Sequence, residues 1–190
     1  MIKTGIFGGS FNPIHNGHIQ LVHQLQEAAN LDEVWLMVSP QNPLKQQGDL
    51  LNDDLRLQMA RRALADDPHI HVSDYEFHLP RPSYTWNTLQ ALKQDFPDRE
   101  FILLIGGDNW ERFPRWYRAD DIVSNYQLVI YPRRGTNIDT TTLPPTITVV
   151  EAELLDISST EIRQRVRNRK SIRGLVPDSI LPTVIDYYRR

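Results

Sequence analysis

The sequence predicts an α/β protein built on a Rossmann-like, doubly wound parallel sheet with a small C-terminal helical part. Two observations lead to this fold class. Short apolar runs of strand length alternate with amphipathic segments of helix length, the order expected of right-handed strand–helix–strand units. In addition, the runs VWLMV (Val34–Val38) and FILLI (Phe101–Ile105) are apolar at every position, as expected of strands buried on both faces.

Each expected element has a local signal in the sequence. Strands are expected at the apolar runs Ile2–Phe7, Val34–Val38, His69–Val72, Phe101–Ile105, Leu128–Tyr131 and Ile147–Val150. Helices are expected at His18–Ala29, from Asn52 to about Ala65, and at Tyr84–Asp95, Ala119–Ser124, Ser159–Asn168 and Ser179–Tyr188. Asn52 and Ser83 are suited to cap two of these helices.

The periodicity also predicts which helix faces turn inward. In the first helix the inward residues are Leu21, Val22, Leu25 and Ala28 or Ala29, and in the second they are Leu55, Met59 and Ala63. The stretch Gly135–Pro145 is rich in Thr, Pro and Gly and is expected to be a mobile loop. No repeat or linker divides the chain, so residues 1–190 are expected to form one domain.

Composition excludes several classes of protein. The chain has no cysteine, which rules out disulfides, thiolate zinc sites and a cysteine nucleophile. A net charge of −3 gives no overall attraction to nucleic acid or to a membrane surface. No apolar run is long enough to span a bilayer. The N-terminus runs straight into a strand pattern rather than a signal peptide, so a cytoplasmic location is the default expectation.

The stretch GIFGGSFNPIHNGH, Gly5 to His18, follows the first strand and opens the first helix. In a doubly wound sheet, ligands bind at this end of the strands. Glycines let backbone N–H groups approach a phosphate, and His15 and His18 can donate further hydrogen bonds. The stretch matches neither G-x-G-x-x-G nor the P-loop pattern. From spacing alone, a phosphate site and an ordinary glycine-rich turn with solvated histidines both remain open.

A histidine pair three residues apart could also ligate a metal ion. No nearby carboxylate completes such a site in the sequence, so metal ligation by His15 and His18 is disfavoured.

The residues Gly9, Phe11, Pro13, His15, Gly17 and His18 resemble the G-x-F-x-P-x-H-x-G-H signature of the HxGH nucleotidyltransferases. Within that superfamily the chain is similar to the nicotinate-nucleotide adenylyltransferases, because NPLK, PSYTWNTL, GGDNWERFPRW, YPRRG and ISSTEIRQRV follow in the order of that family. The resemblance implies transfer of the adenylyl group of ATP, with Mg²⁺, to nicotinate mononucleotide. The products would be deamido-NAD, for NAD biosynthesis, and pyrophosphate.

The resemblance also implies an ATP site. Its catalytic residues would be His15, His18, Lys45 and Arg163, with His18 stabilising charge at the α-phosphate. The remaining ATP-binding residues would be Gly8, Gly9, Ser10, Phe11, Asp108, Ile157, Ser158 and Ser159. The chain departs from the commoner family pattern at Leu44, where a histidine usually precedes the basic residue, so the family's extra histidine is absent.

Nicotinate mononucleotide would bind a second set of residues, namely Ser83, Tyr84, Thr85, Trp116 and Arg134, with Arg133 as the alternative to Arg134. Residues 83–85 begin an expected helix, and helix N-terminal amides favour a carboxylate over a neutral amide. Trp116 matches the aromatic residue that stacks on the pyridine ring in the family. Trp86 and Trp110 are assigned to packing.

Three alternatives remain open. A phosphopantetheine adenylyltransferase shares the histidine loop but does not explain PSYTWNTL or the Trp116 segment. An enzyme acting on nicotinamide mononucleotide is a second alternative, because the amide differs from the acid only by the inversion of one hydrogen bond. A non-catalytic nucleotide-binding or RNA-binding module would keep the fold, but the presence of His15, His18, Lys45 and Arg163 argues against it.

The expected partners are ATP and nicotinate mononucleotide, with no nucleic acid and no membrane. Whether the chain forms a homo-oligomer is left open. The basic cluster in the last third of the chain is expected to be a solvated helix face rather than an RNA site; it comprises Arg165, Arg167, Arg169, Lys170 and Arg173.

Overall fold

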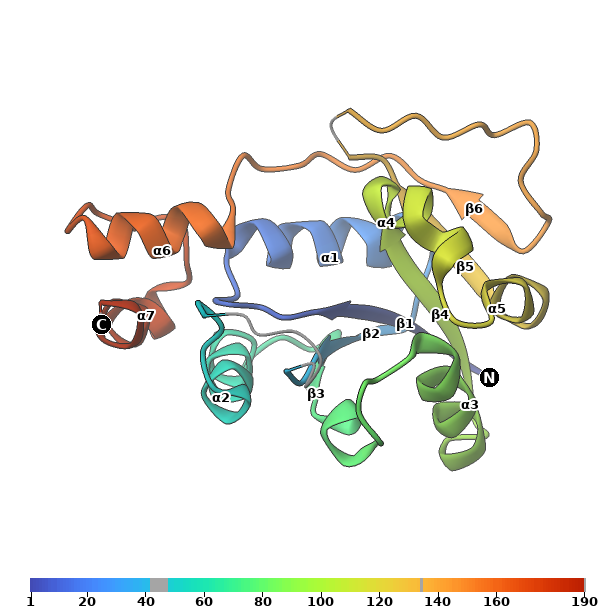
Figure 1. Ribbon diagram of the computed structural model, residues 1–190, viewed down its shortest axis with the longest axis horizontal. Coiled ribbons are helices and arrows are strands. Elements are labelled where there is room, and N and C mark those ends of the chain that lie inside the picture. Colours follow the sequence, from blue (N-terminus) through green and yellow to red (C-terminus); the bar gives the residue numbers. More distant parts are fainter. Residues whose placement is uncertain (42–47, 134, 190) are drawn as a thin grey trace.

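The computed structural model describes residues 1–41, 48–133 and 135–189. Six strands in these residues form one sheet, and every neighbouring pair is parallel, in the order β3-β2-β1-β4-β5-β6 (Figure 1). The strands are β1 (Ile2–Gly9), β2 (Glu33–Val38), β3 (Ile70–Ser73), β4 (Arg99–Gly106), β5 (Gln127–Tyr131) and β6 (Ile147–Val149). The chain winds outward from β1 to β3 and returns across β1 to β4, which confirms the predicted doubly wound sheet.

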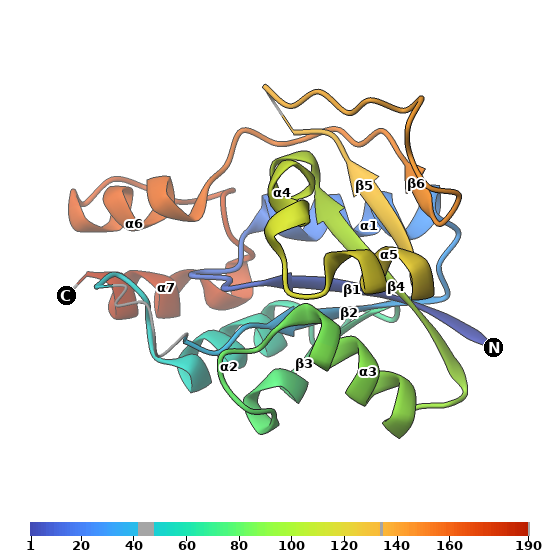
Figure 2. The ribbon, with the colours of Figure 1, turned by 45° about the vertical axis from the view of Figure 1, so that its right-hand side comes forward.

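Helices cover both faces of this sheet. They are α1 (Asn16–Ala28), α2 (Asp53–Ala63), α3 (Thr85–Asp95), α4 (Gly107–Arg112), α5 (Ala119–Asn125), α6 (Ser159–Arg167) and α7 (Leu181–Tyr188), with short 3₁₀ turns η1 (Tyr75–His78), η2 (Phe113–Arg115) and η3 (Asp178–Ile180). Figure 2 shows α6 and α7 together at one end of the molecule, beyond the strands. They form the predicted C-terminal helical part.

Two hydrophobic clusters lie on opposite faces of the sheet. The first packs α1 and α2 against the sheet and also includes residues of α6 and α7, whereas the second packs α3 and α5. Strand β2 contributes to both, because Leu36 belongs to the first cluster and Met37 to the second. Side chains alternate between the two faces of a strand. A strand covered on both sides must therefore be apolar throughout, which explains the run VWLMV.

Most expected elements occur within a few residues of their predicted bounds. The buried face of α1 consists of Leu21, Val22 and Leu25, as predicted, and of the two alanines offered as alternatives Ala29 packs against the first cluster while Ala28 is exposed. Asn52 caps α2, and its side-chain oxygen accepts a hydrogen bond of 2.8 Å from the Asp54 amide. The stretch 135–145 contains no helix or strand. Across the described residues, no helix is both long and apolar enough to cross a bilayer.

The predicted cap at Ser83 is wrong. Helix α3 begins one residue later than expected, so its N-cap is Tyr84, which has no side-chain acceptor for the first-turn amides. The hydroxyl of Ser83 is instead buried without a hydrogen-bond partner. Helix α4 and the 3₁₀ turns were not predicted, because segments this short carry too few residues for a periodic signal.

The predicted inward face of α2 is also partly wrong. Met59 is buried and Ala63 packs against the first cluster, as predicted, whereas Leu55 is only partly buried and belongs to neither cluster. The other buried residues of α2 are Arg56, Leu57 and Ala60. Hydrophobic periodicity assigns every arginine to solvent. Arg56 is nevertheless 0% exposed, because its guanidinium finds oxygen acceptors from three other segments, described below.

Replacing Leu25 with alanine tests the first cluster. Leu25 is 0% exposed at the centre of the α1 face, so the Leu25→Ala variant should lower the free energy of unfolding by about 2–5 kcal/mol. Urea denaturation followed by circular dichroism measures this. Glu27→Ala, on the exposed side of the same helix, is the control and should change the value by less than about 0.5 kcal/mol. Equal effects would contradict the packing described here.

Candidate active site

The junction between β1 and α1 is held by two histidines that cap the helix reciprocally. His15 is the N-cap, and its Nδ1 accepts hydrogen bonds from the amides of Gly17 (3.0 Å) and His18 (3.3 Å). In return, Nδ1 of His18 accepts a hydrogen bond of 3.1 Å from the amide of His15. This is a capping box in which imidazoles replace the usual Ser/Thr and Glu/Gln pair. The spacing of three residues therefore serves the helix start itself.

The reciprocal cap also determines the tautomer of each ring. Because both Nδ1 atoms accept hydrogen bonds, the neutral rings carry their protons on Nε2. The rings stack with centroids 3.6 Å apart. Burial, followed by the charge of Arg133, lowers the pKa of His15 to about 4. Burial, His15 and Arg133, in that order, lower the pKa of His18 well below its ordinary value. Both histidines are therefore neutral Nε2–H donors at pH 7.

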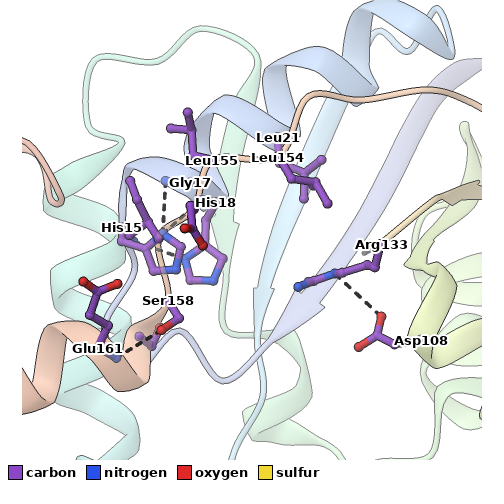
Figure 3. A pocket seen from close by; sticks show the side chains of 13 residues that line it. His15, Gly17, His18, Leu21, Asp108, Arg133, Leu154, Leu155, Ser158 and Glu161 are labelled. Atoms are coloured by element: carbon purple, nitrogen blue, oxygen red, sulfur yellow. Dashed lines mark hydrogen bonds and ion pairs between the residues drawn. The ribbon is translucent and has the colours of Figure 1, made fainter. Parts of the chain in front are cut away.

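A cavity of about 450 Å³ lies beside the two imidazoles (Figure 3). Arg133 and Asp108 lie across the cavity from the histidines, with the Arg133 Nε 3.6 Å from the Asp108 Oδ1. The other residues that line the cavity are Gly17, Leu21, Leu154, Leu155, Asp156, Ile157, Ser158, Ser159 and Glu161. Apolar side chains thus form one part of the wall, and hydrogen-bond donors form another.

The start of α6 faces the same cavity. Ser158 is its N-cap and accepts a hydrogen bond of 3.1 Å from the Glu161 amide. Ser159 donates a 2.9 Å hydrogen bond to the carbonyl of Pro13 and so joins this helix to the β1–α1 loop. The free amides at a helix N-terminus attract anions. The starts of α1 and α6 thus meet at one cavity, although they lie far apart in the sequence.

Arg163 of α6 fixes the loop between β1 and α1 by a hydrogen bond to its backbone. Its Nη1 donates a 2.9 Å hydrogen bond to the carbonyl of Asn12, and its Nε is buried without a partner. Asn12 is itself 6% exposed, and its side-chain oxygen accepts hydrogen bonds from the Tyr188 hydroxyl (2.6 Å) and the Leu51 amide (3.2 Å). Arg163 thus contacts the loop backbone rather than lining the cavity.

Arg56 of α2 also fixes the loop between β1 and α1. Its guanidinium donates to the carbonyls of Ser10 (2.6 Å), Ser39 (3.0 Å) and Leu51 (2.8 Å) and pairs with the Asp53 carboxylate. The ends of β1 and β2 are therefore tied to the start of α2. A buried charge is tolerated here because each side of the guanidinium has an acceptor.

The structure brings together half of the twelve residues predicted for the ATP site. His15, His18, Asp108, Ile157, Ser158 and Ser159 all line the cavity. Phe11 does not, because its ring is 2% exposed and packs edge-on against the His18 ring at 5.0 Å. Ser10 contributes its carbonyl to Arg56, while a Cβ added at Gly8 would meet open space. Lys45 and Arg134 lie outside the described residues.

Three of the residues predicted to bind the mononucleotide, Ser83, Tyr84 and Thr85, lie at the start of α3. Tyr84, its N-cap, stacks obliquely on Tyr117 with ring centroids 5.0 Å apart. This contact brings the start of α3 to the segment that carries Trp116, whose ring lies 5.1 Å from that of Phe113. The buried Ser83 hydroxyl lies beside the uncapped first turn of α3. Trp86 and Trp110 pack in the second cluster, as predicted.

Several cavity residues escaped the sequence analysis. Leu21 was assigned to the core only, and nothing in the sequence distinguishes Leu154, Leu155 and Glu161 as cavity walls. Arg133 was named only as an alternative, although it lines the cavity. Arg56 was missed because a single arginine within a helix gives no sign of burial.

Acid sensitivity should follow from the lowered pKa of His15. Its folded pKa is about 4 and its unfolded pKa is about 6.5, so between these values the unfolded chain binds a proton that the folded chain does not. The free energy of unfolding should therefore fall as the pH drops from about 6.5 to about 4. His15→Asn keeps a capping oxygen and should make this fall shallower, as measured by urea denaturation at successive pH values.

The control for this experiment is His69→Asn, since His69 is exposed and lies outside the cavity. This variant should keep the wild-type pH profile. Parallel profiles for wild type and His15→Asn would contradict the description of a buried, neutral His15.

The chain is similar in sequence to known proteins. A family model described as cytidylyltransferase-like matches residues 6–165. A protein of Bacteroides fragilis (strain YCH46) is 50% identical over 183 residues, covering 96% of this chain and 91% of its own length. A protein of Bacteroides thetaiotaomicron is 46% identical over 189 residues, covering 100% and 94%. Both are described as "probable nicotinate-nucleotide adenylyltransferase".

Solved structures share the fold at lower identity. The Plasmodium falciparum nicotinic acid mononucleotide adenylyltransferase complexed with NaAD superposes with a TM-score of 0.79 at 21% identity, covering 98% of this chain and 94% of that one. The same enzyme complexed with APC gives a TM-score of 0.78. With the family match over most of the chain and the identity to the two Bacteroides proteins, this chain belongs to the cytidylyltransferase-like nucleotidyltransferases and, among them, to the nicotinate-nucleotide adenylyltransferase family.

Proposed function

We propose that this protein transfers the adenylyl group of ATP to nicotinate mononucleotide, giving deamido-NAD and pyrophosphate. One observation carries the proposal. Two neutral imidazoles with Nε2–H donors, the N-terminus of α6 and the guanidinium of Arg133 surround a single cavity. Donors of these three kinds suit a polyphosphate. The apolar wall of Leu21, Leu154 and Ile157 suits a nucleobase and its ribose.

The reaction requires alignment rather than a protein nucleophile. An oxygen of the mononucleotide 5′-phosphate forms a bond to the α-phosphorus of ATP, and the bond from that phosphorus to the bridging oxygen breaks. Pyrophosphate leaves with the electron pair of that bond. A phosphomonoester has a second pKa of about 6, so the attacking oxygen needs no general base at neutral pH. The protein therefore has to orient two polyanions and neutralise the developing charge.

The cavity residues suit these tasks. Nε2–H of His18, with that of His15 stacked against it, would donate to oxygens of the α-phosphate. The α6 N-terminus, capped by Ser158, would receive the β- and γ-phosphates. The neutral imidazoles would bind phosphate oxygens by directed hydrogen bonds. Because both Nδ1 atoms already accept from backbone amides, each ring has its proton on Nε2 before ATP binds. Lys45 and Arg134, outside the described residues, remain predictions as phosphate ligands.

Mg²⁺ would arrive with ATP. Among the described residues, no group of three or more His, Asp or Glu side chains is placed to hold a metal ion. Mg²⁺ commonly binds through substrate phosphates, water and one or two carboxylates. The carboxylate of Asp108 lines the cavity, and its Oδ1 lies 3.6 Å from the Arg133 Nε but accepts no hydrogen bond, so this carboxylate fits that requirement. When bound, the ion would neutralise charge on the departing pyrophosphate.

The start of α3 is the proposed binding site of the nicotinate carboxylate. Tyr84 leaves the first-turn amides of α3 without a side-chain cap, and the Ser83 hydroxyl beside them lacks a partner. Amide N–H groups at a helix N-terminus favour a carboxylate over a carboxamide. Trp116, on the segment joined to Tyr84 through Tyr117, would stack on the pyridine ring. This arrangement favours the acid over nicotinamide mononucleotide.

The substrate preference can be measured by pyrophosphate release with ATP and Mg²⁺. Nicotinate mononucleotide should be used with a kcat/KM at least about tenfold above that of nicotinamide mononucleotide, because one charge-assisted hydrogen bond is worth about 1.5–3 kcal/mol. Phosphopantetheine should give no release. Equal use of the amide would contradict the role of the α3 N-terminus, and preference for phosphopantetheine would reassign the enzyme.

His18 can be tested without disturbing the helix start. His18→Gln keeps an acceptor suited to the reciprocal cap but removes the imidazole donor to the α-phosphate. Loss of one donor to developing charge should reduce kcat about 10²- to 10³-fold, measured in the same assay. The control is His23→Ala, on the same helix but paired with Asp67 at 2.8 Å, away from the cavity. A fully active His18→Gln enzyme would exclude the proposed role.

A further inference from the structure

The segment between β6 and α6 forms one wall of the cavity without any secondary structure of its own. Residues 150–158 contain neither helix nor strand, and they cross the outer side of α1 on the way to α6 (Figure 1). Leu154, Leu155 and Ile157 from this segment line the cavity (Figure 3). A further apolar lining residue, Leu21, belongs to α1. The width of the cavity at this point depends on what fixes the segment to the helix.

Gln24 of α1 fixes this segment through two hydrogen bonds to one residue. Its Nε2 donates to the Glu153 carbonyl at 2.9 Å, and the Glu153 amide donates to its Oε1 at 2.7 Å. A primary amide can pair with a peptide group in this way because it offers one donor and one acceptor side by side. On either side of Glu153, Ala152 and Leu154 pack against the first hydrophobic cluster. The pairing therefore fixes the segment both in position and in orientation.

Gln24 does not itself belong to the cavity wall. It lies three residues after Leu21 on α1, so the two side chains project from the same side of the helix. The same helix begins with the reciprocal histidine cap. One helix therefore carries the histidines at its start, one apolar lining residue and the anchor for the segment that lines the cavity with Leu154, Leu155 and Ile157.

We propose that Gln24 is a positioning residue of the nucleotide subsite, which acts by holding residues 153–157 at the distance from α1 that accepts the adenosine part of ATP. The inference rests on the proposed function, since it assigns ATP to this cavity. Gln24 contacts no reacting group. Its contribution is made equally in the ground state and in the transition state, so its loss should raise KM for ATP and leave kcat nearly unchanged.

The test compares Gln24→Ala and Gln24→Glu with wild type in the pyrophosphate assay. Gln24→Ala should raise KM for ATP about tenfold, the equivalent of about 1.4 kcal/mol for the two lost hydrogen bonds. KM for nicotinate mononucleotide and kcat should stay within about twofold of wild type. Gln24→Glu cannot donate to the Glu153 carbonyl and should be at least as impaired. The control, Gln20→Ala, changes the same residue type on the same helix away from the cavity wall and should behave as wild type.

A second readout separates this inference from the proposed function. Calorimetric titration with ATP and Mg²⁺ alone should show weaker binding to Gln24→Ala, and hydrogen exchange should be faster at the Glu153 amide. Wild type that binds ATP, with both Gln24 variants binding equally well, overturns the inference and leaves the proposed function in place. A fall in kcat with unchanged KM for ATP also overturns it. Wild type that binds no ATP overturns both.

Discussion

The reciprocal histidine cap at the start of α1 is the interaction on which the cavity depends. In this cap the Nδ1 atoms of His15 and His18 accept hydrogen bonds from backbone amides, so the Nε2–H group of each ring remains available as a donor. Burial and the positive charge of Arg133 lower the pKa values of both rings and so keep them neutral. A helix cap and a ligand site are thereby built from the same two side chains. Removing either imidazole disturbs the fold locally unless the replacement can also accept from the backbone.

The loop that precedes this cap is held by polar groups from distant parts of the chain. Arg56 of α2 binds the Ser10 carbonyl, Arg163 of α6 binds the Asn12 carbonyl, and Tyr188 of α7 binds the Asn12 side chain. Buried backbone carbonyls require partners, and a loop offers them none of its own. The C-terminal helices therefore contribute to the site indirectly, by fixing the conformation of the loop that carries the histidines.

Two helix starts in this protein differ in how far their own side chains satisfy them. Ser158 caps α6 and leaves part of the first turn for a ligand, whereas Tyr84 provides α3 with no side-chain cap and Ser83 adds an unpartnered hydroxyl. The first-turn amides of a helix need acceptors from outside the helix, which water or a ligand can supply. In the proposed complex, the nicotinate carboxylate would accept hydrogen bonds from the first turn of α3, and the phosphates would accept them from the first turn of α6. Ligand binding would thereby also stabilise the two helix starts.

The sequence by itself determined the fold class, the position of the histidine loop after the first strand, and the family. These follow from local apolar periodicity and from an ordered set of motifs, which any reader of the chain can see. Only the tertiary structure decided that Arg56 is buried, that Ser83 does not cap α3, and that Gln24 anchors a cavity wall. The physical reason is that polar side chains are placed by their partners. Those of Gln24 and Asn12 lie 129 and 176 residues away in Glu153 and Tyr188, and no local pattern reports them.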